Sequence, residues 1–319
     1  PMVVTLSETG YVKRLPIDTF RSQGRGGVGI SSGQLKEEDT LRSIFVANNH
    51  SYLLAFTDLG RVHWLKVYHI PESGRTSRGK AIVNLLNLGE GEVVRQLLPI
   101  PAGFDQEDQF LVLATRNGTI NKIALKLFAN PRRGGINAVA LEEGDELVSV
   151  LLSDQSQNMM IATRNGQAIV FPPTAFRALG RGTRGVRGIR LEEGDRVIGM
   201  IVLEPETQVF TITENGYGKR TPTGEYRVTN RGGKGIRNIL VTAKTGPAVG
   251  IAAAYDDSEV MVTTANGTVM RTAINTISSY GRSSQGVRVV RLRGGDKVKD
   301  MTVGRPEEDD SMVEEGKEE

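Results

Sequence analysis

Six short basic loops rich in glycine carry the chemistry that this sequence is best suited to perform. Their small residues allow a backbone to approach a phosphate closely, and their arginines and lysines neutralise its charge. One such loop alone is usually an ordinary solvated turn, but six in register favour a track for a long polyanion. The candidate contact residues are Arg25, Arg75, Arg78, Lys80, Arg132, Arg133, Arg181, Arg184, Arg231, Lys234, Arg282 and Arg288.

The loops recur because the chain contains a sixfold internal repeat marked by two glycines in each unit. A period of about fifty residues with β character indicates a ring of four-stranded blades. We therefore expect an all-β, propeller-like ring of six blades. The first mark closes a turn, at Gly10, Gly60, Gly118, Gly166, Gly216 and Gly267. The second lies in the basic loop, 17 or 19 residues later, at Gly29, Gly79, Gly135, Gly185, Gly235 and Gly286.

The turns between β-like runs predict hairpins. Four of the six turn glycines follow asparagine, at Asn117, Asn165, Asn215 and Asn266. An Asn-Gly pair between extended runs predicts a two-residue type I′ turn, in which both central residues have positive φ. No segment combines helical periodicity with caps, so no α-helix is expected.

A second basic set follows the turns. Strand alternation predicts that many of these side chains lie on the outer edge of a blade, where they would flank the basic loops. The set is Lys13, Arg14, Arg61, Lys122, Lys219, Arg220 and Arg271.

Composition argues against several other classes of function. There is no cysteine, and His50, His63 and His69 lack the spacing of metal ligands. No Ser/His/Asp set or carboxylate pair can be assembled from repeat positions, so we expect no catalytic residue, metal or cofactor. Aromatic residues are only 5% of the chain, which argues against recognition by base stacking. Without a membrane-length apolar run or a signal peptide, a cytoplasmic protein with no membrane partner is expected.

The net charge of +3 conceals an asymmetry. The last fifteen residues hold eight acidic and two basic side chains, so the rest of the chain is more basic than the total suggests. A basic body with an acidic tail is typical of nucleic-acid-binding proteins. We expect one ring domain over residues 1–304 and a disordered acidic tail over residues 305–319.

The first basic loop resembles a known signature. Its residues Gln23, Gly24, Arg25, Gly26, Gly27, Val28 and Gly29 resemble the box Q-[RK]-R-G-G-[RK]-G of the bacterial DNA gyrase A subunit. Residues 10–13, 82–86, 183–190 and 215–221 also resemble the C-terminal domain of that gyrase chain, and the likeness extends from about residue 2 to 304. Gly24 and Val28 replace basic residues of the box, whereas residues 231–235 keep R-G-G-K-G in a different unit.

This resemblance implies a six-bladed β-pinwheel whose outer strands are exchanged between neighbouring blades. It implies a basic rim that wraps duplex DNA with positive handedness and presents it to the strand-passage core, an ATP-dependent type II topoisomerase that introduces negative supercoils. The implied partners are duplex DNA, the remainder of the gyrase A subunit, and the gyrase B subunit that this remainder would contact. The resemblance places the active-site tyrosine, ATP site and metal site of that isomerase outside this chain, so the domain alone would be no enzyme.

Two alternatives remain open. The related C-terminal domain of the topoisomerase IV A subunit delivers DNA without strong wrapping and lacks a full box. Six complete repeats, a partial box and the acidic tail favour the gyrase type. A propeller that serves as a protein-interaction scaffold is less consistent with arginine in the loops and few aromatic residues.

Overall fold

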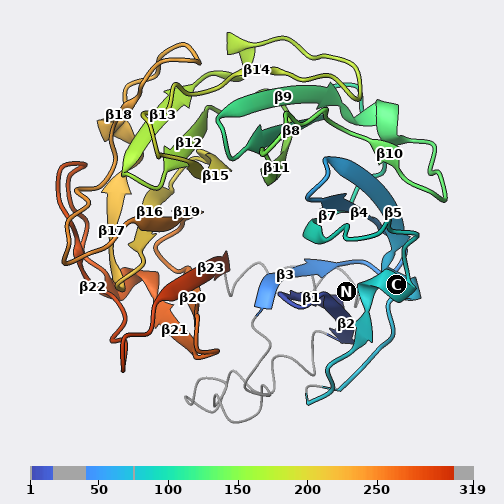
Figure 1. The fold of residues 1–319 in the computed structure, drawn as a ribbon, viewed down its shortest axis with the longest axis horizontal. Helices are drawn as coiled ribbons and strands as arrows, with labels where there is room; N and C mark the ends of the chain where they lie inside the picture. The colour runs from blue at the N-terminus through green and yellow to red at the C-terminus, as the bar shows by residue number, and fades with distance from the viewer. Residues whose placement is uncertain (1, 17–40, 75, 305–319) are drawn as a thin grey trace, which may run out of the picture.

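Strands of the chain form six sheets arranged in a ring in the computed structural model, which describes residues 2–16, 41–74 and 76–304 (Figure 1). Among these residues five sheets have four strands and one has three. The same part of the chain contains 3-10 turns but no α-helix. The prediction of an all-β ring of six blades is confirmed. The 3-10 turns are η2 (Val67–His69), η3 (Ile82–Asn84), η4 (Leu125–Phe128), η5 (Pro173–Ala175), η6 (Thr223–Glu225) and η7 (Ile274–Thr276).

Each blade is built on an antiparallel hairpin, and the last long strand of the same unit pairs with the hairpin on the side of the ring centre (Figure 1). The hairpins are β1 (Met2–Ser7) with β2 (Tyr11–Pro16), β4 (Tyr52–Thr57) with β5 (Arg61–Lys66), β8 (Phe110–Thr115) with β9 (Thr119–Ala124), β12 (Met159–Thr163) with β13 (Gln167–Phe171), β16 (Gln208–Thr213) with β17 (Tyr217–Pro222), and β20 (Glu259–Thr264) with β21 (Val269–Ala273). The inner strands are β3 (Leu41–Ala47), β7 (Val94–Ile100), β11 (Leu147–Ser153), β15 (Val197–Val202), β19 (Ala248–Ala254) and β23 (Val298–Gly304).

A short outer strand completes each of the first five blades, and the next unit of the chain supplies it. For example, Val186 follows the hairpin of blade 4 but pairs with Ile120 in β9 of blade 3. Four of the donated strands lie on the outside of the ring in Figure 1. This is the strand exchange that the resemblance implied. The donated strands are β6 (Lys80–Ala81), β10 (Ile136–Asn137), β14 (Val186–Arg187), β18 (Ile236–Arg237) and β22 (Val287–Arg288).

The periodic glycines hold each donated strand at both ends. Before β18, Gly235 has a φ of +75°, and a Cβ there would lie 2.2 Å from the backbone oxygen of Ala168 in the accepting strand. After β18, the amides of Asn238 and Ile239 donate to the carbonyl oxygen of the turn glycine Gly166. The two marks of the repeat therefore serve strand exchange, in addition to any approach of a phosphate to the loops.

The predicted type I′ turns are wrong. In blade 3 the loop spans residues 116–118, Gly118 has a φ of +93°, and its amide donates to Thr115 O. Asn117 does not have positive φ, and neither do Asn165, Asn215 or Asn266. This is a three-residue hairpin that ends in a left-handed glycine. The physical reason lies in the neighbouring segment, because Asn117 N–H donates to Asp145 Oδ1 at 3.0 Å and so supports the longer turn.

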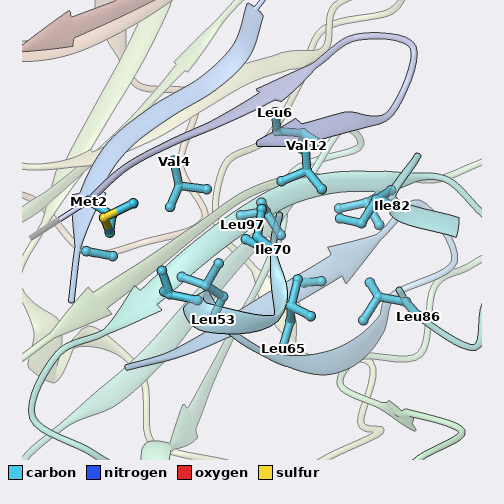
Figure 2. Close-up of a cluster of buried hydrophobic side chains, with 14 residues drawn as sticks. Met2, Val4, Leu6, Val12, Leu53, Leu65, Ile70, Ile82, Leu86 and Leu97 are labelled. Atoms are coloured by element: carbon cyan, nitrogen blue, oxygen red, sulfur yellow. The ribbon is translucent and has the colours of Figure 1, made fainter. Parts of the chain in front are cut away.

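The hydrophobic core lies between consecutive blades. Figure 2 shows one such cluster, in which Val4 and Val12 of blade 1 pack with Leu53 and Leu65 of blade 2. Ile82, which follows the donated strand β6, is buried in the same cluster. Burial of these side chains therefore stabilises the joint between two blades as well as each blade itself.

Candidate nucleic-acid interface

The five basic loops that precede β6, β10, β14, β18 and β22 lie on the circumference of the ring, because each of them leads directly into a donated outer strand (Figure 1). Arg25, Arg75 and the predicted box, from Gln23 to Gly29, lie outside the described residues. The other ten predicted contact residues are accessible. Arg231 and Arg282 are partly exposed, and the exposed ones are Arg78, Lys80, Arg132, Arg133, Arg181, Arg184, Lys234 and Arg288.

Backbone hydrogen bonds join the loops of neighbouring blades. Gly232 N donates to Gly188 O at 2.7 Å, and Arg190 N donates to Gly233 O at 2.8 Å, which connects the loop on blade 4 to the segment after β14 on blade 3. Equivalent bonds connect residues 138–140 to 182–183, and residue 240 to 284. The loops on blades 2–5 therefore form a continuous rim, with a fixed spacing between their charges.

Carboxylates of the described residues leave several charges on this rim uncompensated. Within residues 2–16, 41–74 and 76–304, no ion pair involves Arg132, Arg133, Arg181, Arg184 or Lys234. Several arginines near the hairpin turns differ, because they form ion pairs. Uncompensated cations in a row create a positive potential that attracts a polyanion.

The arginines near the turns pair with glutamates at moderate distances. Arg95 and Arg116 lie 3.5 and 3.4 Å from the carboxylate oxygens of Glu146. Arg164 lies 3.8 Å from Glu214. Carboxylates thus compensate some of the positive charge near the turns.

The predicted outward position is wrong for the lysines of the second basic set. Lys219 is fully buried, and its Nζ donates to the carbonyl oxygens of Gly281, Arg282 and Ser284 at 2.6, 2.9 and 2.8 Å. Burial lowers the pKa of Lys219 from 10.5 to about 8. Lys13 and Lys122 are also buried. These side chains point under the loop or turn donated by the next unit, which covers the face that alternation alone predicted to be open.

Residues three positions after the turn glycines share this supporting role. Lys13 Nζ donates to Ser77 O at 2.9 Å, and Asn121 Nδ2 donates to Thr183 Oγ1 at 3.0 Å. His63 packs against Gly135, and its Nε2 lies 2.9 Å from Glu92 Oε1. Each of these side chains supports the basic loop on its own blade from inside. The fixed spacing after the turn glycine is the sequence signal that could have identified them.

Two rim arginines were missing from the predicted contact set. Arg187 and Arg237 are exposed and form the second residue of β14 and β18. They occupy the repeat position of Arg288 in β22, two residues after the loop glycine. That spacing was visible in the sequence.

The chain matches the family model described as "DNA gyrase C-terminal domain, beta-propeller". The match covers residues 1–48, 51–101, 109–154, 157–204, 207–247 and 258–304. Each segment contains one hairpin, and all except the fifth also contain the inner strand of that blade. The chain belongs to this family. The family assignment that the first basic loop and its neighbouring motifs indicated is therefore confirmed.

Curated relatives of this gyrase domain agree with the family match. The chain is 48% identical to the DNA gyrase A subunit of Halalkalibacterium halodurans, over 98% of this chain and 37% of that protein. It is 43% identical to the DNA gyrase A subunit of Fibrobacter succinogenes, over 94% of this chain and 39% of that protein. The chain therefore spans less than two fifths of the length of these relatives.

Solved structures show the same architecture. A DNA gyrase A C-terminal domain superposes with a TM-score of 0.78 at 25% identity, covering 94% of this chain and 98% of that one. The C-terminal domain of a DNA topoisomerase IV superposes with a TM-score of 0.81 at 22% identity, covering 99% and 98%, a likeness of fold alone.

The described part of the gyrase domain offers neither a metal cluster nor a membrane-spanning helix. Among these residues, no group of three or more His, Cys, Asp or Glu side chains could hold a metal ion. No helix there is long and apolar enough to cross a membrane.

Proposed function

We propose that this domain binds duplex DNA along its basic rim and wraps it with positive handedness. The observation that carries the proposal is the continuous rim of blades 2–5, whose loops are joined by backbone hydrogen bonds and carry cations that form no ion pair with a carboxylate of the described residues. The proposed contacts on the described part of the rim are Arg78, Lys80, Arg132, Arg133, Arg181, Arg184, Arg231, Lys234, Arg282 and Arg288.

A long basic rim suits the energetics of DNA bending. Bending roughly 40 base pairs through half a turn costs on the order of 10 kcal/mol, given a persistence length of about 50 nm. About six to ten phosphate contacts, with the counterions they release, are enough to offset that cost. Because such contacts are made to the backbone, binding would tolerate many sequences, with preferences set by deformability.

In the whole protein the wrapped DNA would be presented to the strand-passage core, and positive wrapping would lead to negative supercoiling. The partners in this proposal are the remainder of a gyrase A subunit, the gyrase B subunit that it would contact, and DNA in the bacterial cytoplasm. The identity of 43% and 48% to two gyrase A subunits supports this role. In this proposal the domain sets the path of the bound DNA, and the rest of the enzyme carries out the chemistry of strand passage.

The decisive experiment closes nicked circular DNA with ligase in the presence of the 319-residue chain, at several salt concentrations. We expect a protein-dependent positive shift in linking number that decreases as salt rises, because phosphate contacts weaken with salt. Absence of DNA binding at low salt would overturn the proposal, and binding with a negative shift would overturn its handedness.

DNA delivery without strong wrapping, as in the topoisomerase IV type, is the second candidate. It is favoured by one observation, that Gly24 and Val28 replace two basic residues of the predicted box. Salt-sensitive binding with no change in linking number in the same experiment would support this candidate. Salt-insensitive binding to a protein, without DNA affinity, would instead support an interaction scaffold.

A further inference from the structure

We infer that the DNA path is held most strongly on the arc of blades 3–5, by a second row of arginines formed by Arg187, Arg237 and Arg288. This inference rests on the proposed function and specifies which part of the rim contributes most to affinity. The three arginines, here called the strand row, lie on the donated strands β14, β18 and β22 rather than in the loops before them.

The strand row is confined to this arc. Its position, two residues after the loop glycine, holds Ala81 on blade 1 and Asn137 on blade 2. Among the described residues, blade 1 has two exposed cations nearby, Arg78 in its loop and Lys80 at the preceding position of β6. Blades 3–5 therefore carry an arginine at the second position of the donated strand in addition to loop cations, whereas blade 1 carries a lysine at the first position and blade 2 has cations on its loop alone.

Strand alternation directs the strand row outward. In β14 and β18 the residue before each arginine, Val186 or Ile236, is half-buried, and the arginine itself is exposed. Arg187 is paired in register with Thr119, and Arg237 with Gln167, in the outer strands of their hairpins. Since neighbouring residues of a strand face opposite sides, these arginines project away from the blade core.

The fold places a loop arginine of the next blade beside each of the first two strand arginines. Arg231 Nη1 donates to Arg187 O at 3.1 Å, and Arg282 Nη1 donates to Arg237 O at 2.9 Å. A loop guanidinium group is thus fixed against the backbone of a strand arginine at each of these blade junctions. Neighbouring cations of this kind suit the closely spaced phosphates of a duplex.

Arg288 at the end of the arc is held by an aromatic ring. Its Nη2 donates to the Tyr217 hydroxyl at 3.1 Å, and its guanidinium lies 5.4 Å from the ring centroid. Lys244 Nζ lies 5.5 Å from the same centroid. The Tyr217 ring therefore lies beside two cations, and it contributes no negatively charged group that would form an ion pair with either of them.

In the part of the chain that the structure describes, no carboxylate forms an ion pair with Arg187, Arg237 or Arg288. Blade 4, in the middle of the arc, also has a cavity of about 360 Å³ lined by Arg227, Arg231 and Lys234. The arc thus combines two rows of cations, which have no ion pair with the described carboxylates, with a recess lined in part by basic side chains. DNA should leave blades 1 and 2 before it leaves blades 3–5.

Two charge-matched variants of the 319-residue chain test the arc. R187A/R237A/R288A removes the strand row, and K80A/R132A/R133A removes three exposed cations from blades 1 and 2. Affinity for a duplex of about 40 base pairs is measured by fluorescence anisotropy at several KCl concentrations. We expect the slope of log K against log salt to fall by about 2 to 3 for the strand-row variant and by at most about 1 for the other. At about 0.1 M salt the strand-row variant should bind about tenfold more weakly than the other.

Arg288 also contacts Tyr217, so its removal could affect more than DNA contacts. The double variant R187A/R237A, which keeps Arg288, is therefore compared with R132A/R133A. Circular dichroism checks that every variant is folded. Equal losses of DNA affinity in the matched variants, or a larger loss for the variant on blades 1 and 2, would overturn the inference that blades 3–5 hold the DNA most strongly. The proposed function would remain intact. If the unmodified chain binds no DNA at any salt concentration, the proposed function fails and the inference fails with it.

Discussion

Lys219 is a buried cation that shapes a surface loop. Its ammonium group is fully buried, and it donates to three carbonyl oxygens of the basic loop that lies over it. Those carbonyls are turned inward, so the loop can present Arg282 at the rim. At the scale of single residues, the interface therefore depends on buried side chains that would not touch DNA.

The lowered pKa of Lys219 predicts a pH dependence of stability. Below about pH 8 both the folded and the unfolded chain hold the proton, and the folded state carries the full desolvation cost. Between about pH 8 and the ordinary value of 10.5, the folded chain releases its proton first, so stability from this group rises with pH. Relative to K219M, the free energy of unfolding of the native chain should rise by up to about 3 kcal/mol across that window.

Urea unfolding of both proteins at about pH 7.5, 9 and 10 measures this difference. The variant K219M serves as the reference, since methionine has similar length and no charge, and other titrating groups cancel in the subtraction. A difference that stays constant or falls with pH would contradict the prediction.

At the scale of elements, strand exchange requires the loop glycines, because the chain passes close to the accepting strand at these positions. Gly235→Ala introduces a Cβ 2.2 Å from Ala168 O at a residue with positive φ. Either the donated strand β18 moves away from blade 4 or the accepting strand shifts. We expect a loss of about 2–4 kcal/mol in the free energy of unfolding, together with weaker DNA binding.

Gly233→Ala in the same loop is the matched control. A Cβ there meets only Ile169 Cδ1 at 3.8 Å, an ordinary contact, and Gly233 does not have positive φ. Chemical denaturation should place this variant within about 1 kcal/mol of the native chain. Equal destabilisation by the two substitutions would show that the close approach of Gly235 is not the cause.

The repeat of glycines was enough to predict the ring, the number of blades and the position of the basic loops. Local patterns could not show that β14 belongs to the blade before its own hairpin, because a two-residue strand carries too little alternation to identify its partner. The same limit explains Lys219. Alternation assigned its side chain to a face, but a loop from the next unit covers that face. Arg187 and Arg237 were predictable from spacing, since they repeat the position of Arg288.

Closure of the whole ring brings blade 6 against blade 1, and charged side chains lie close together at this interface between blades, here called a seam. Lys299 Nζ lies 2.5 Å from Glu8 Oε2. Burial raises the pKa of Asp300 to about 6, with Glu8 adding to the rise and Arg42 and Lys299 opposing it. The neighbouring seam between blades 5 and 6 differs, because Gly250 there lies against the side chain of Met301.

Asp300→Asn should stabilise the ring at neutral pH. Because the folded-state pKa of Asp300 is raised from 3.8 to about 6, stability from this group falls as pH rises through that window, and the full cost is present above about pH 6. Asparagine removes the charge that causes the cost. We expect a gain of about 1–2 kcal/mol at about pH 7.5, allowing for solvent screening, and little gain at about pH 4.

Thermal and chemical unfolding at the two pH values checks this prediction. Asp108→Asn, at an exposed position on the loop before β8, changes the same residue type in blade 3 and controls for the loss of one negative charge. A loss of stability in Asp300→Asn at the higher pH, or the same gain in both variants, would contradict the proposed cost of burying Asp300.

Within the described residues, units 2–5, of about fifty residues each, both receive an outer strand and supply one, so this part of the ring has no internal point at which part of a unit can be removed cleanly. A partial deletion leaves one sheet edge unpaired, which invites association with other chains. Duplication or loss of a whole unit keeps every edge matched and changes only the circumference. Recombination between repeats could therefore alter the length of DNA that such a ring accommodates, but only in steps of one blade.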